Sequence, residues 1–455
     1  MESHEKLKYF SAFREKLHRA ITIVLGLPYH KSLHHDYCQA INRFEQLTMI
    51  LGSCKYGFNS GNKLYRLKVD TQFHYMHCII RISLFALAIR LILCLFSTNR
   101  MVHVFLADPF IDYKPSWPIY CFLLFTVISL SLLKEAYLRI ESQGVLNQHL
   151  DVYNEIRRNR MSIVKLISEN RVKIFYSVTI FCANFWHRLI LLTIPTACFF
   201  SFVIYHESTE LYRDSQYLWS TLFWFPSTLL SIISLVTFLM SIGGYQFITV
   251  NLILFRLRSI VVQIQTVRAS GAPTAGITWE GFNDDTFVYK QIIAYLNKLD
   301  YLSKGYKSLI FGIILLPASI SNFSVFAGIV VRSQSELLSS FLLAFGLSTF
   351  IGLTLVIYFC ADIMNQLRKI HDQLHLLNRG IKLRVSSHFK INEIIARLQG
   401  PTNGIKIGDL ATMTERFAVI VRLLLDKTAR EMSVYSEYDM NLTFILVQMQ
   451  SLTLQ

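Results

Sequence analysis

Residues 217–247 read YLWSTLFWFPSTLLSIISLVTFLMSIGGYQF and contain no Asp, Glu, Lys or Arg. About 20 mainly apolar residues in an α-helix cross a bilayer core about 30 Å thick, and a helix satisfies its own backbone hydrogen bonds. This stretch therefore predicts a membrane-spanning helix. Five more apolar runs predict further spans, at residues 73–97, 117–133, 173–205, 308–331 and 341–361.

The composition of the whole chain agrees with a polytopic membrane protein. Of its 455 residues, 53% are hydrophobic and 16% are charged, and the mean hydropathy is +0.39, whereas a globular protein has about 25% charged residues. Too little polar surface remains for a water-soluble particle, and 34 Phe and 22 Tyr are far more than a disordered chain contains. We predict an all-α fold with seven spans, the seventh at about 435–454.

Basic residues predict the orientation of the helices. Segments 1–72, 134–173, 256–307 and 362–430 together hold 38 of the 45 Lys and Arg, while the alternate connections hold four. Loops rich in Lys and Arg stay in the cytoplasm. We therefore expect a plasma-membrane protein with a cytosolic N-terminus and an extracellular C-terminus, opposite to a G-protein-coupled receptor. The net charge of +15 then reflects topology, and no nucleic-acid partner is expected.

The chain is predicted to divide into four parts, with helices that extend from the membrane into the cytosol. The parts are a cytosolic N-terminal region at 1–72, helices 1–6 at 73–361 with cytosolic extensions at 134–173 and 256–307, cytosolic anchor helices at 362–430, and a seventh helix at 431–455. An apolar stripe at helical spacing supports the anchor helices. Its members are Ile363, Leu367, Ile370, Leu374 and Leu377.

The sequence contains no pattern that predicts an enzyme. The motifs of hydrolase, phosphate-binding, zinc-protease and dinucleotide sites do not occur, so we expect no catalytic residue and no cofactor. The histidines around Asp36, and the pair His371 and His375, are interpreted as polar surface and helix packing, so no metal site is expected. Arg81 and Arg90 are nine residues apart, which places them on opposite helix faces and argues against a voltage sensor.

Aromatic and polar residues in several spans suggest a pocket for a small molecule, because such sites are cavities between helices with a few polar groups. The alternative interpretation for the same residues is lipid contact, core packing or a structural hydrogen bond. The candidate pocket residues are Tyr120, Trp186, His187, Arg188, Phe199, Trp219, Trp224, Phe323, Phe326, Phe341 and Phe345.

The seventh predicted helix carries a polar stripe. Tyr435, Asp439, Thr443 and Gln450 return to nearly the same face at 100° per residue. A water-lined pathway explains such a stripe, since polar groups buried without partners are costly. A polar face packed against neighbouring helices is the alternative.

Near the C-terminus, Thr443 and Phe444 precede five residues, Gln450 and Ser451. This pattern resembles the insect gustatory receptor family of ligand-gated channels, which ends in Thr-Tyr, five mostly apolar residues and Gln-Phe. Phe444 and Ser451 replace the family's Tyr and Phe, and Gln448 interrupts the apolar stretch. The inverted seven-helix topology and the long inward helices strengthen the resemblance.

The resemblance implies a homotetramer or heterotetramer, in which one final helix per subunit surrounds a cation pore in the lipid bilayer. Pore residues would be Tyr435, Asp439, Thr443, Phe444, Val447, Met449, Gln450 and Ser451. It also implies an outer pocket for a small-molecule ligand, which the sequence does not identify. Light or peroxide sensing is a variant of this interpretation, and a membrane transporter or scaffold is the alternative.

Overall fold

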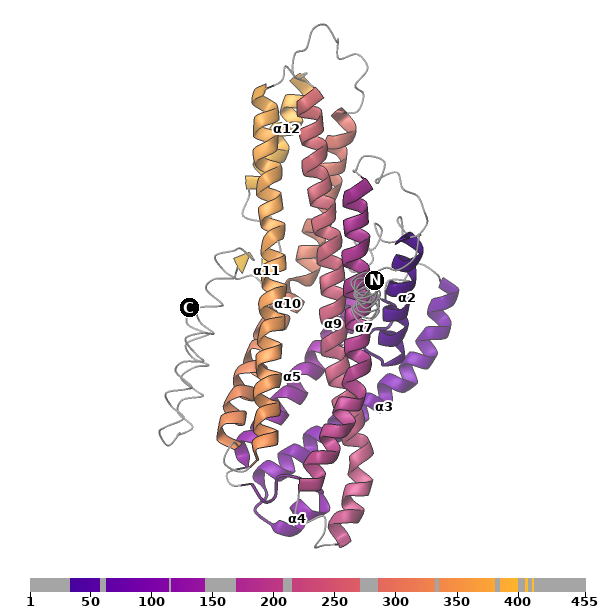
Figure 1. Cartoon of the computed structure of the whole chain (residues 1–455), viewed down its shortest axis with the longest axis vertical. Coiled ribbons are helices and arrows are strands. Elements are labelled where there is room, and N and C mark those ends of the chain that lie inside the picture. The colour runs from indigo at the N-terminus through magenta and orange to yellow at the C-terminus, as the bar shows by residue number, and fades with distance from the viewer. Residues whose placement is uncertain are drawn as a thin grey trace, which may run out of the picture.

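The computed structural model shows an elongated bundle of helices (Figure 1). It describes residues 33–57, 63–113, 116–143, 169–207, 215–270, 285–331, 335–380, 385–399, 406–407 and 411–412. The helices are α2 (Leu33–Ile50), α3 (Lys63–Phe96), α4 (Arg100–Phe105), α5 (Trp117–Ser142), α7 (Glu169–Glu207), α9 (Ser215–Ser270), α10 (Asp285–Val331), α11 (Glu336–Gly380) and α12 (Val385–Gln399). Two short strands, β1 (Lys406–Ile407) and β2 (Ala411–Thr412), form an antiparallel ribbon. In this ribbon Lys406 pairs with Thr412.

Six of these helices are long and apolar enough to cross a membrane, as predicted. The stretches concerned are Phe73–Phe96, Trp117–Ser142, Val172–His206, Ser215–Thr266, Ser303–Ile329 and Glu336–Arg379. Each of them contains most or all of one predicted span. The predicted seventh helix, with all the predicted pore residues, lies outside the residues that the structure describes.

The three longest described helices, α9, α10 and α11, are at least twice as long as a bilayer core is thick. The 56 residues of α9 measure about 84 Å at 1.5 Å per residue, compared with a hydrocarbon core of about 30 Å. Together, α9, α10 and α11 therefore project beyond any membrane they cross. The predicted extension at 256–307 continues α9 to Ser270 and resumes in α10 at Asp285, and α11 continues to Gly380.

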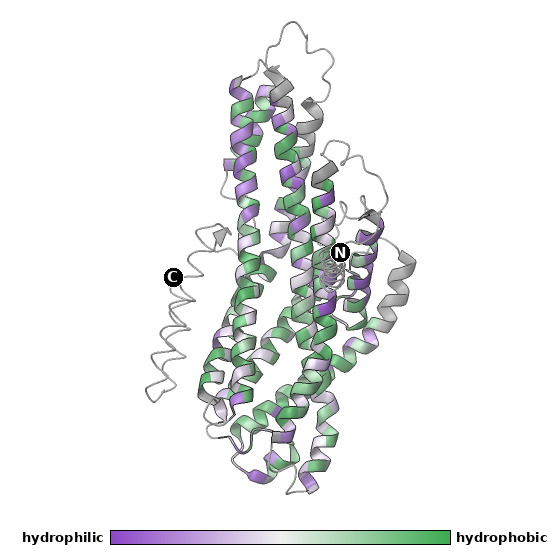
Figure 2. Ribbon diagram, viewed as in Figure 1, coloured by the Kyte–Doolittle hydropathy of each residue, from purple (hydrophilic) through white to green (hydrophobic). Residues whose placement is uncertain are grey.

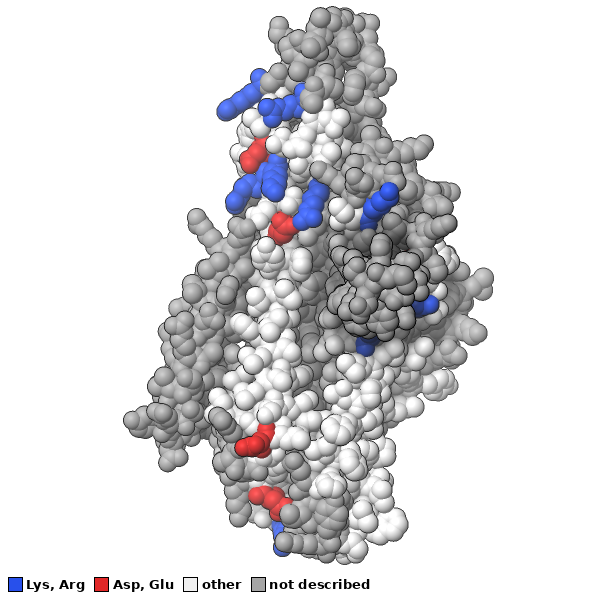
Figure 3. Space-filling model, in the orientation of Figure 1, with Lys and Arg blue, Asp and Glu red and all other residues white. Residues whose placement is uncertain are grey.

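Polarity changes along the bundle. Its α4 half is mainly hydrophobic, whereas polar residues gather along α11 toward its α12 end and on α2 (Figure 2). On the face shown in Figure 3, uncharged surface separates charges near the α12 end from those near the α4 end. This distribution fits a bundle whose α4 half crosses a bilayer.

The predicted apolar stripe of the anchor region is confirmed. Ile363, Leu367, Ile370, Leu374 and Leu377 are all at most 3% exposed and belong to one core with α2, α7, α9 and α10. A second core joins α3 and α5 with parts of α9, α10 and α11. Helical periodicity was sufficient for this prediction, since residues three or four apart share one face.

Small residues bring α10 and α11 into close contact. The hydroxyl of Ser321 donates to the carbonyl oxygen of Gly346 at 2.7 Å, and that of Ser324 donates to the carbonyl oxygen of Leu342 at 2.7 Å. A Cβ atom at Gly346 would lie 2.8 Å from Cγ2 of Val325 and 3.0 Å from the Ser321 carbonyl oxygen. The two backbones can therefore approach closely only because Gly346 has no side chain, as in other membrane helix pairs.

We predict that Gly346→Ala destabilises the bundle by about 1–3 kcal/mol, because the new methyl group overpacks the contact with α10. Gly352→Ala is the matched control on the same helix, since nothing lies within 4 Å of a Cβ atom there. Thermal unfolding of both variants in detergent measures the difference. Equal unfolding midpoints for the two variants would show that the contact between α10 and α11 is looser than described.

Candidate functional site: an apolar cavity beside a polar cluster

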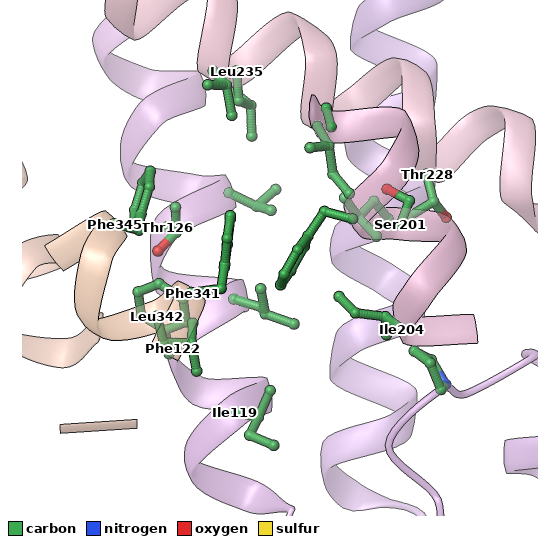
Figure 4. Close-up of a pocket in the computed structure, with 18 of the residues that line it drawn as sticks. Ile119, Phe122, Thr126, Ser201, Ile204, Thr228, Leu235, Phe341, Leu342 and Phe345 are labelled. Atoms are coloured by element: carbon green, nitrogen blue, oxygen red, sulfur yellow. The ribbon is translucent and has the colours of Figure 1, made fainter. Parts of the chain in front are cut away.

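A cavity of about 430 Å³ lies between five helices in the α4 half of the bundle. Its walls come from α3, α5, α7, α9 and α11, together with the turn that follows α4 (Figure 4). Binding sites for small molecules have volumes of about 300–1,000 Å³ and are mostly apolar. The volume therefore suits an organic molecule of moderate size.

Aliphatic and aromatic side chains form most of the cavity wall. The rings of Phe200 on α7 and Phe341 on α11 stack with their centroids 3.5 Å apart, and Phe345 lies one turn farther along α11. Leu123, Ile204 and Leu235 are among the aliphatic side chains of the wall. A ligand here would gain stability chiefly by removing apolar surface from water.

Several threonine hydroxyls in the wall are bonded within their own helices. Thr193 donates to the carbonyl oxygen of Leu189 at 2.8 Å, and Thr196 donates to that of Leu192 at 2.8 Å. Thr126 differs, because its buried Oγ1 has no hydrogen-bond partner among the described residues. An unpartnered buried hydroxyl is costly, so Thr126 is the wall residue best suited to bond a ligand.

Arg90 is a buried cation at the cavity wall and joins four parts of the chain. From α3 it donates to Oγ1 of Thr228 on α9 at 2.7 Å and to the hydroxyl of Tyr205 on α7 at 2.9 Å. It also donates to the carbonyl oxygen of Ala107 at 2.5 Å. Ala107 has φ +50°, a conformation that is unfavourable for a residue with a side chain. Arg90 therefore holds a strained turn against the helices.

Asp108 is the centre of a polar cluster beside Arg90. Its Oδ2 accepts a hydrogen bond from the Tyr120 hydroxyl and lies 2.6 Å from Nδ1 of His103. Its Oδ1 accepts from the backbone N–H of Phe110 at 3.0 Å, and its carbonyl oxygen accepts from the Tyr217 hydroxyl at 3.0 Å. Hydrogen bonding to this carboxylate raises the pKa of His103. The cluster therefore fixes the turn after α4 against α5 and α9.

Three of the eleven predicted pocket residues line this cavity. They are Tyr120, Phe341 and Phe345. Trp224 lies beside it, with Arg90 5.7 Å from the centre of its ring and its indole N–H donating to the carbonyl oxygen of Phe105 at 3.2 Å. The aromatic residues of the sequence prediction therefore do not form one surface.

The other predicted pocket residues lie elsewhere. Trp186 packs against Gly243 and Gly244, where a Cβ atom would come within 3.0 Å of its ring. Phe323 contacts the ring of Phe125 at 5.2 Å. Phe199 and Trp219 are 66% and 71% exposed on the outer surface of the described bundle. The last three predicted residues are His187, Arg188 and Phe326. Arg188 is exposed, and the other two are half-buried.

Sequence reasoning missed Thr126 and Asp108. Thr126 shares its apolar run with Ser129 and Ser131. Nothing in its spacing distinguishes it from a residue bonded to its own helix, as Ser131 is through the carbonyl oxygen of Val127. Arg90 and Arg81 were correctly expected on different faces, since Arg90 is 4% exposed while Arg81 is exposed and pairs with Glu135. An arginine within a span is itself a signal of a buried polar site.

Comparisons with known proteins assign no family to the chain. No family model matches it, and no curated protein matches it either. Its function is therefore proposed from the cavity, the polar cluster and the resemblance described above.

We predict that Arg90→Met destabilises the protein by about 3 kcal/mol or more, because buried acceptors on Ala107, Tyr205 and Thr228 lose a charged donor at about 1–3 kcal/mol each. Arg90→Lys should have an intermediate effect, since a lysine cannot reproduce the planar donor geometry. Arg100 is exposed on α4, so the free energy of unfolding of Arg100→Gln should stay within about 0.5 kcal/mol of the wild-type value. Thermal unfolding in detergent measures all three, and an unchanged midpoint for Arg90→Met would contradict the anchoring role.

Proposed function

We propose that this protein is a chemosensory receptor, of the gustatory type, that binds a small molecule in the cavity and opens as a cation channel. The observation that carries the proposal is the cavity itself, whose walls come from five of the six helices suited to span a membrane. The resemblance of the C-terminal residues to insect gustatory receptors supports the channel activity.

The wall of the cavity favours an uncharged, mainly apolar ligand with one hydrogen-bonding group. A sugar would bring many hydroxyls into an apolar wall, and each unpaired hydroxyl costs free energy. A carbonyl, alcohol or phenol group could bond the free Oγ1 of Thr126. Arg90 already donates to three acceptors, which makes it less suited to bind a ligand carboxylate.

The proposed mechanism couples the cavity to the pore through α11. Leu338, Phe341, Leu342 and Phe345 in the first turns of α11 contribute to the cavity wall, and the same helix continues to Gly380. A ligand shifts a gating equilibrium only if it binds one state better than the other. Repacking of Phe341 against Phe200 on ligand binding would provide this difference, and α11 would transmit it.

The pore is proposed to form from residues 431–455 of several subunits, as a homotetramer or heterotetramer. In this arrangement Asp439 forms a ring of carboxylates, which raises the local concentration of cations and repels anions. The charge distribution of the connecting segments supports a cytosolic N-terminus and an extracellular C-terminus. The α4 end of the bundle and the cavity would then face the outside of the cell.

Recording from cells that express only this chain tests the proposal against a transporter or scaffold. Hydrophobic alcohols, ketones and phenols, with sugars and oxidants as comparison groups, are screened with a calcium reporter and then applied to membrane patches. A channel gives unitary currents when an active compound is applied. A chain that reaches the cell surface and gives no unitary current with any compound would favour the alternative.

We predict that Thr126→Val raises the half-maximal concentration of an active alcohol or ketone about two- to tenfold, which corresponds to one hydrogen bond of about 0.5–1.5 kcal/mol. The analogue without the polar group should be unaffected. Thr196→Val is the matched control, because the Thr196 hydroxyl is bonded to its own helix. Concentration–response curves measure the effect, and equal shifts in both variants would argue against a ligand bond to Thr126.

We predict that Asp439→Asn lowers cation conductance or divalent permeability while assembly is retained. Glu437→Gln should mainly affect expression or gating, since Glu437 lies 200° away on an ideal helix at 100° per residue. Unitary conductance and reversal potentials in ionic gradients measure both variants. The opposite result, with permeation changed by Glu437→Gln alone, would mean that the helix presents its other face to the pore.

A further inference from the structure

Three potential metal ligands converge at the α4 end of the cavity. The ligand atoms of Cys94 on α3, His103 on α4 and Asp108 in the following turn all lie within 4.8 Å of one another. Cys94 and Asp108 are 4% and 1% exposed, and both belong to the cavity wall. Among the described residues, this is the one group of three such side chains close enough to hold an ion.

The orientation of His103 suits a metal ligand. Its Nε2 lies 2.9 Å from the carbonyl oxygen of Ser97, and a carbonyl oxygen can only accept, so Nε2 carries a hydrogen. Metal-binding histidines usually donate their second ring N–H to a carbonyl or carboxylate, which fixes the ring. The other nitrogen, Nδ1, points to Oδ2 of Asp108 at 2.6 Å. A proton between these two atoms can therefore be replaced by a cation.

The ligand set indicates which cation. One thiolate, one imidazole and one carboxylate form a mixed set that suits Zn²⁺, whose bonds to these atoms are about 2.0–2.3 Å long. Calcium and magnesium take oxygen ligands almost entirely. Tetrahedral bonds of about 2.0–2.3 Å place neighbouring ligand atoms roughly 3.3–3.8 Å apart. The three ligand atoms lie within 4.8 Å of one another, so small side-chain shifts would bring them to these distances.

Charge balance permits this exchange in a buried cluster. With a protonated His103 and a neutral Cys94 thiol, the cluster and the adjacent Arg90 carry one net positive charge. Zinc binding adds two positive charges, and the protons of Nδ1 and the thiol leave for the solvent. The net charge is therefore unchanged, and Arg90 keeps its hydrogen bonds to Ala107, Tyr205 and Thr228.

We propose that Cys94, His103 and Asp108 bind Zn²⁺, with the fourth position open toward the cavity. Three protein ligands with one open position characterise a site that also accepts water or an exogenous ligand. The bound ion would tie α3 to the turn after α4 at the wall of the cavity. This proposal concerns binding by the chain itself and does not depend on channel activity.

Cobalt substitution in the purified full-length protein tests the thiolate ligand. Co²⁺ bound by a thiolate gives a charge-transfer absorption band, so the wild type should show this band and Cys94→Ser should lose it. Cys121→Ser is the matched control, because Cys121 is a half-buried cysteine beside Tyr120 that is not part of the group. Absence of the band in the wild type, or its persistence in Cys94→Ser, would overturn the proposal.

Competition with a chromogenic zinc chelator tests the other ligands. His103→Gln and Asp108→Asn should each weaken Zn²⁺ binding at least about tenfold, since even outer contacts of metal ligands contribute 10- to 100-fold. His206 is an exposed histidine at the end of α7, and the control variant His206→Gln should bind Zn²⁺ as the wild type does. Gel filtration selects folded variants, and a folded His103→Gln protein with wild-type affinity would contradict the proposed site.

Discussion

A guanidinium group cannot remain unpaired inside an apolar bundle, and the α4 half of this protein is organised around that constraint. Arg90 meets it with acceptors from α7, α9 and the turn after α4. The resulting contacts hold Ala107 in an unfavourable conformation and place Asp108 beside His103 and Tyr120. One buried charge thus connects three of the five helices around the cavity, α3, α7 and α9, to the turn after α4.

The same constraint applies to other buried charges in the bundle. The carboxylate of Glu141 on α5 accepts backbone N–H groups of Lys55, Tyr56 and Gly57 at 2.8–2.9 Å and so fixes the loop after α2. Lys134, which is 1% exposed, donates to the hydroxyl of Ser234 on α9 at 2.9 Å. These contacts connect helices whose apolar surfaces alone would permit sliding, because lipid and protein interiors are similarly apolar.

The cavity wall contains polar side chains fixed by hydrogen bonds and apolar side chains that can repack. Asp108 and Arg90 are held by several hydrogen bonds each, whereas another part of the wall contains stacked rings from α7 and α11. Stacked rings can rearrange at a small cost compared with breaking a buried charged network. In the proposed receptor, ligand binding would therefore act on α11, and a bound zinc ion would act on the turn after α4.

The sequence by itself determined the six apolar helices long enough to span a membrane and the core stripe of α11, because both follow from local rules. Twenty apolar residues must form a helix in lipid, and positions three or four apart must share a face. The two-residue ribbon at Lys406 and Ala411 lacks such a signal, since short strands depend on their partners.

Only the tertiary structure decided which polar groups meet. Residues 90, 205 and 228 belong to three different helices, and their contacts depend on how those helices cross and rotate. For the same reason Trp186 and Phe199 were expected in one pocket but lie in a helix contact and on the outer surface. Hydropathy specifies that a residue is inside a membrane, whereas packing alone specifies which neighbour it contacts.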